Sequence, residues 1–126
     1  MPRSPFQYAM LRVVPRIERG ECINAGVVLF ARTLDYLGVA IALDEERLRA
    51  LHPDVDPAAV AAQLRGLERI GAGDPAAGPI ARLTPSQRFH WLVAPSSTSV
   101  QPSEVHTGLC DDPEATLRHL VARLVL

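Results

Sequence analysis

Three apolar stretches with the alternation of β-strands precede any helical pattern in this chain, at residues 6–14, 25–32 and 37–43. In the first stretch, apolar side chains occupy both alternating faces, which is typical of a strand inside a sheet. In the third, one face carries Leu and Ile or Val, and the other holds only Gly38, Ala40 and Ala42, which would let another element approach closely. The pattern predicts that the three stretches form one sheet.

Helix start signals follow these strands. Asp44 and Asp56 can each cap a helix, Thr84 and Gln87 have the spacing of a capping box, and Asp112 precedes the last apolar stripe. Residues 71–79 have the composition of a loop, and residues 96–108 indicate an irregular strand or edge hairpin. We therefore expect an α+β fold, with an antiparallel or mixed sheet of three to five strands and helices largely on one face.

Size and charge exclude several classes of protein. The 126 residues are 48% apolar, which predicts one globular domain over 1–126. The net charge of −1 predicts no overall electrostatic attraction to nucleic acid or to anionic membranes. No secretory signal or spanning segment is seen, and Cys22 and Cys110 have no metal or redox spacing, so we expect free thiols and a cytoplasmic protein. All 13 basic residues are arginine, which excludes lysine-dependent chemistry.

Arg12 is the first polar residue that demands an explanation, because it shares a strand face with apolar side chains. A buried guanidinium needs a partner, so we predict a contact with the carboxylate of Glu18, Glu21 or Asp44. The alternative is an anion-binding site formed by Arg12 and Arg16.

Other polar residues could also carry chemistry. Glu18, Glu21 and Asn24 crowd together with Arg16 between the first two strands, where they could form an acid–base pair, bind a hard cation or make a solvated turn. His90 and His106 lack a close ligand pair, so we expect no metal site, and nothing in the chain indicates a cofactor. No nucleophile elbow surrounds the serine and threonine residues at 96–98.

Longer motifs resemble a known family. They are FQYA at 6–9, LRVVPR at 11–16, NAGVVL at 24–29, RFHWL at 88–92, VQP at 100–102 and VHTG at 105–108. Together they resemble the bacterial family called domain of unknown function 3037, over nearly the whole chain. The resemblance implies no assigned activity, substrate or cofactor. Members of that family are often encoded beside a HipA-like kinase, which implies a kinase-like protein partner.

The polar residues of these motifs come from both ends of the chain and could converge on one binding surface. We predict that His90, Gln101 and His106 lie near Arg12 or Arg16, although a buried polar network could demand the same residue types. The candidate binding residues are Arg12, Arg16, Glu18, Asn24, His90, Ser97, Gln101 and His106.

Two functions remain open at this point, and a nucleic-acid binder has little support. A small binding or accessory module is favoured, because no complete nucleophile–base or metal constellation can be assembled. The alternative is a small enzyme that acts on an anionic or phosphorylated ligand through Arg12, Glu18, His90 and His106. The sequence assigns no oligomeric state.

Overall fold

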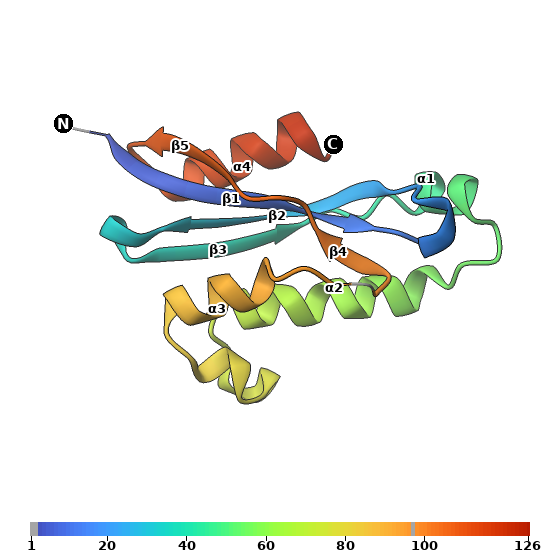
Figure 1. Cartoon of the computed structure of the whole chain (residues 1–126), viewed down its shortest axis with the longest axis horizontal. Helices are drawn as coiled ribbons and strands as arrows, with labels where there is room; N and C mark the ends of the chain where they lie inside the picture. Colours follow the sequence, from blue (N-terminus) through green and yellow to red (C-terminus); the bar gives the residue numbers. More distant parts are fainter. Residues whose placement is uncertain (1–2, 97) are drawn as a thin grey trace.

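The computed structural model describes residues 3–96 and 98–126, which form a five-stranded antiparallel sheet flanked by helices (Figure 1). The strands are β1 (Ser4–Val13), β2 (Ile23–Ala31), β3 (Tyr36–Ile41), β4 (Val100–Pro102) and β5 (His106–Cys110). Their order is β3-β2-β1, and both β4 and β5 pair with the remaining edge of β1. The predicted α+β class and the three early strands are confirmed.

β1 is the centre of the sheet, as its two apolar faces predict. Leu11 and Val13 are buried on one face, and Phe6 is buried on the other. The predicted irregular segment at 96–108 contains β4 and the start of β5, which both pair with β1 and do not form a hairpin with each other. β4 pairs with the C-terminal part of β1 and β5 with its N-terminal part, so one edge of β1 is covered in two pieces.

The helices begin where their caps predict. They are α1 (Glu45–Leu51), α2 (Pro57–Gly71), α3 (Pro85–Leu92) and α4 (Pro113–Leu124). The side chains of Asp44, Asp56 and Asp112 each accept a hydrogen bond from a first-turn N–H, and Thr84 and Gln87 form a complete capping box. Short 3-10 turns lie at Ile17–Arg19, Arg32–Leu34, Pro75–Ala77 and Ile80–Arg82. No helix among the described residues is long and apolar enough to span a bilayer.

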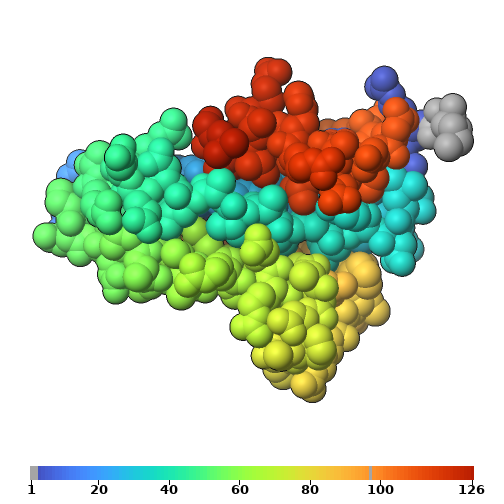
Figure 2. Space-filling view, turned by 180° about the vertical axis from the view of Figure 1, so that it is seen from behind, coloured from blue at the N-terminus to red at the C-terminus, as the bar shows by residue number. Residues whose placement is uncertain are grey.

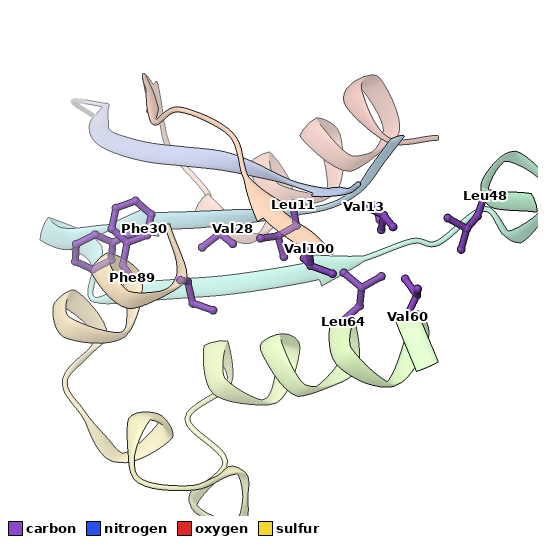
Figure 3. Close-up of a cluster of buried hydrophobic side chains, with 11 residues drawn as sticks. Leu11, Val13, Val28, Phe30, Leu48, Val60, Leu64, Phe89 and Val100 are labelled. Carbon is purple, nitrogen blue, oxygen red and sulfur yellow. The ribbon is translucent and has the colours of Figure 1, made fainter. Parts of the chain in front are cut away.

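The sheet has a different cover on each side. α2 and α3 pack on one face, where Phe30 stacks on Phe89 with ring centroids 5.1 Å apart, and α1 adds Leu48 to the same core (Figure 3). α4 covers the other face through Leu117, over Val27 and Leu29. Most helices therefore share one face, as expected, and α4 is the exception.

The small residues of β3 permit close packing by α4. A Cβ atom added to Gly38 would lie 2.8 Å from the Cδ2 atom of Leu117. A larger side chain at residue 38 would push α4 away from the sheet. The prediction of a close approach at Gly38, Ala40 and Ala42 is confirmed at this position.

Candidate functional site

Three of the predicted binding residues share one rung of the sheet. Arg12 on β1 is paired with Asn24 on β2 and with Gln101 on β4. Their side chains lie on the face that α4 covers, because the neighbours Leu11 and Val13 point into the core beneath α2. The structure thus brings together residues that are distant in the sequence.

A β-bulge in β2 makes this rung. Leu11 pairs with Gly26, but the next residue, Arg12, pairs with Asn24, so Ala25 is the additional residue. An extra residue reverses the alternation of side chains beyond it, which turns Asn24 toward α4 instead of toward α2.

Asn24 has a structural partner at the end of α4. Its Nδ2 atom donates a hydrogen bond of 2.9 Å to the carbonyl of Leu124, and the Nη1 atom of Arg47 lies 3.5 Å from the carbonyl of Val125. The last carbonyls of a helix lack partners within the helix. Asn24 therefore ties the C-terminal end of α4 to the bulge.

Arg12 does not form the predicted ion pair. Its Nη2 atom donates a long hydrogen bond of 3.4 Å to the carbonyl of Pro102, and its buried Nε atom has no partner among the described residues. In that same part of the chain no carboxylate lies within 4.0 Å of its guanidinium, so the prediction is wrong.

The expected carboxylate partners bind arginines close to them in sequence instead. Glu18 lies 3.9 Å from Arg16, and Glu21 is paired with Arg19, which raises the pKa of the Arg19 guanidinium. Asp44 caps α1 and lies 3.5 Å from Arg47. Residues 16–21, between β1 and β2, thus form an internally paired surface turn, and Arg16 and Glu18 belong to it rather than to the rung.

Gln101 holds the segment that leads into β4. Its Nε2 atom donates a hydrogen bond of 2.9 Å to the carbonyl of Thr98, and the Thr98 hydroxyl donates one of 2.9 Å to the carbonyl of Val100. Ser97, another predicted binding residue, lies outside the described residues.

The two histidines do not join the rung. His106 pairs with Tyr8, with ring centroids 5.2 Å apart, four positions along β1 from Arg12 and thus about 13 Å away at the usual rise of a strand. His90 lies on α3, on the opposite side of the sheet, with Nδ1 2.7 Å from the carbonyl of Ser86. The predicted convergence therefore holds for Gln101 and fails for His90 and His106.

A groove of about 380 Å³ lies between α2, α3 and β4. Its apolar lining consists of Leu11, Leu67, Trp91, Leu92, Pro95 and Pro102, together with Ala94 and Val100. The polar lining side chains are those of Gln63, Ser96 and Thr98, and none of the described residues that line it is charged. The hydroxyls of Ser96 and Thr98 are already bonded to each other at 2.9 Å. Such a groove suits apolar groups rather than an anion.

Trp91 was missed as a site residue by the sequence reasoning. It is the single tryptophan of the chain, and 44% of its surface is exposed although it lines the groove. A signal for it was present, because the core face of α3 is set by Phe89 and Leu92, and helical geometry places Trp91 to the side of that face.

No group of three or more His, Cys, Asp or Glu side chains within residues 3–96 and 98–126 is arranged to hold a metal ion. Cys22 and Cys110 are both free. Burial raises the pKa of the Cys110 thiol, so this cysteine is held as the neutral thiol inside the α4 core.

The fold and the groove define a small α+β domain with an apolar surface depression and no assembled catalytic constellation among the described residues. The family model described as "Protein of unknown function (DUF3037)" matches residues 8–125, so the chain belongs to this family. Comparison with curated proteins and with solved structures finds no match.

Proposed function

We propose that this domain is a binding module, and that the groove between α2, α3 and β4 seats apolar side chains of a protein partner. The observation that carries the proposal is Trp91, which lines an apolar groove while 44% of its surface stays exposed. Tryptophan is enriched among the residues that dominate binding energy at protein interfaces, because it buries a large rigid surface.

The alternative enzyme has less support. Acid–base or nucleophilic chemistry would need Arg12, Glu18, His90 and His106 around one reacting group. Glu18 is in an exposed turn, His90 is on α3, and Arg12 and His106 are on the α4 face at different levels of β1. A binding function needs no such convergence.

The partner that we propose is the kinase-like protein implied by the family resemblance. A segment of that protein with exposed apolar side chains would match the lining of the groove. The polar residues Ser96 and Thr98 in the lining carry no charge. The affinity for the segment should therefore depend only weakly on the salt concentration.

The experiment is calorimetric titration of this domain with the purified kinase-like protein. We expect Trp91→Ala to weaken binding by about tenfold or more, because a buried tryptophan anchor is lost. The matched control is Leu109→Ala, which shortens a side chain that is 61% exposed on β5 and does not line the groove. Circular dichroism would verify that both variants are folded.

Two results would contradict the proposal. Equal binding by Trp91→Ala and the unaltered domain would exclude the groove as the interface. Loss of affinity in Leu109→Ala with normal binding by Trp91→Ala would place the interface on β5 instead.

A further inference from the structure

β3 presents an open edge of the sheet. It pairs with β2, and within the described residues no other strand lies beside it. The N–H of Ala42 donates to the carbonyl of Ala25, so alternation makes the backbone groups of Gly38 and Ala40 face β2. The N–H and C=O groups of Leu37, Val39 and Ile41 therefore point away from the sheet.

This edge strand, Tyr36–Ile41, lacks charged residues and proline, two of the devices that commonly prevent pairing. The opposite edge is different, because Pro102 removes a donor from β4 and the chain leaves the ladder before β5 begins at His106. A continuous, uncharged edge is a template for another strand.

The flanks of β3 are self-complementary in charge. Figure 2 shows β3 as a strip between α4 and α2, and a hollow of about 540 Å³ lies there. α2 brings Glu68 and Arg69 to this hollow, and α4 brings Glu114 and Arg118. Each helix thus supplies one acid and one base, which is the arrangement that a two-fold axis can satisfy.

We propose that β3 pairs antiparallel with β3 of a second copy of this chain, which makes one sheet continuous across a dimer. The outward-facing residues are centred on Val39, so a two-fold axis there places each Val39 opposite its own copy and Leu37 opposite Ile41. Leu117 lies against Gly38, next to that axis, so α4 and its copy run past each other at this point. Glu114 of one protomer then faces Arg118 of its partner.

This surface is separate from the groove that contains Trp91, so the dimer does not depend on the proposed function. A single polar segment of another protein would gain nothing from the alternating charges on both flanks. Within one chain Glu114 lies 3.4 Å from Arg118, and Arg69 lies 3.0 Å from Asp74, both at the exposed surface. A second copy brings the same acid and base on each flank and can exchange the Glu114–Arg118 pair for two pairs across the axis, which is why we assign the edge to it.

Two measurements on the unaltered protein test the proposal. Sedimentation equilibrium should give a dimer that dissociates on dilution. Hydrogen exchange of the amides of Leu37, Val39 and Ile41 should slow as the protein concentration rises, because those N–H groups are free in one copy and bonded in two. A monomer at all concentrations would overturn the proposal, as would a dimer whose concentration-dependent protection lies elsewhere.

Charge reversal provides the third measurement. Glu114→Arg should weaken the dimer by about tenfold or more, since it places arginine opposite arginine, and Glu114→Arg combined with Arg118→Glu should restore it. The matched control is Glu45→Arg, because Glu45 also pairs with an arginine four residues later, at 3.2 Å, but on α1. A dimer unaffected by Glu114→Arg would overturn the interface. So would a monomer in which these amides are protected only after an extended peptide is added.

Discussion

The Oγ atom of Ser103 accepts a hydrogen bond of 2.8 Å from the backbone N–H of Met10, at the point where β4 has ended and β5 has not begun. The same hydroxyl donates to the carbonyl of Glu104 at 2.9 Å, and the Ser103 N–H donates to the Met10 carbonyl at 2.8 Å. Ser103 is the polar residue buried at this junction. The Ser103 side chain thus accepts the hydrogen bond from Met10 of β1 that a neighbouring strand would accept in a continuous sheet.

We predict that Ser103→Ala lowers the free energy of unfolding by about 1–3 kcal/mol, because the Met10 N–H is left buried without an acceptor. Urea denaturation measures the change. Ser99→Ala, at an exposed serine of the preceding segment, is the control and should change the free energy by less than about 0.5 kcal/mol. Equal effects of the two substitutions would contradict the role given to the Ser103 hydroxyl.

Adding a negative charge at residue 24 should lower the free energy of unfolding more than shortening its side chain does. Asn24→Asp removes the donor to the Leu124 carbonyl and adds a negative charge at a helix C-terminus, so we expect a loss of about 2 kcal/mol in the free energy of unfolding. Asn24→Ala should cost about 1 kcal/mol, because it removes the donor alone. Thermal unfolding of both variants measures which one loses more stability. If Asn24→Asp were more stable than Asn24→Ala, the result would contradict the hydrogen bond from Asn24 to the Leu124 carbonyl.

Arg12→Met should leave the free energy of unfolding unchanged or raise it by about 1 kcal/mol. The guanidinium makes one hydrogen bond of 3.4 Å and buries its Nε atom without a partner among the described residues, so its removal abolishes a desolvation cost. Methionine keeps the length of the aliphatic stem. A loss of more than about 1 kcal/mol in urea denaturation would show that Arg12 has a stabilising partner after all.

Asp74 predicts a pH dependence of stability. The Ala76 N–H and then the Arg69 side chain lower the pKa of this carboxyl below its usual 3.8. A lowered pKa contributes stability above the unfolded-state pKa, and the contribution is lost as the pH falls through the folded-state value. The difference in stability between the unaltered protein and Asp74→Asn should therefore be largest near neutral pH and shrink in acid. A difference that is constant across this range would contradict the prediction, and Asp54→Asn at an exposed carboxylate provides the baseline.

Sequence patterns predicted the elements well because their causes are local. The caps at Asp56 and Thr84 act within three residues, and the apolar alternation of β1 and β2 extends over each whole strand. The division of residues 96–108 into β4 and β5 was less accessible, because it depends on which part of β1 each piece meets.

The site was harder to predict because its geometry depends on features that do not follow from spacing. Proximity of Glu18 and Glu21 in the sequence indicated a partner for Arg12, but Arg16 and Arg19 are closer still and on the same turn. The meeting of Arg12 with Asn24 requires the bulge at Ala25, since a regular strand would direct Asn24 to the other face. Ion-pair choice and bulges are decided by competing neighbours in three dimensions.

The position of β1 has a consequence for how this protein is made. Among the five strands of this sheet β1 is synthesised first, yet its partners on one side are β4 and β5, which end at Cys110. The hairpins of β1 with β2 and of β2 with β3 can form early from nearby residues, whereas the other edge of β1 waits for almost the whole chain. During synthesis β1, the central strand of the finished sheet, therefore has one unpaired edge. In a chain stalled before β4 this edge would be free to pair with strands of other nascent chains.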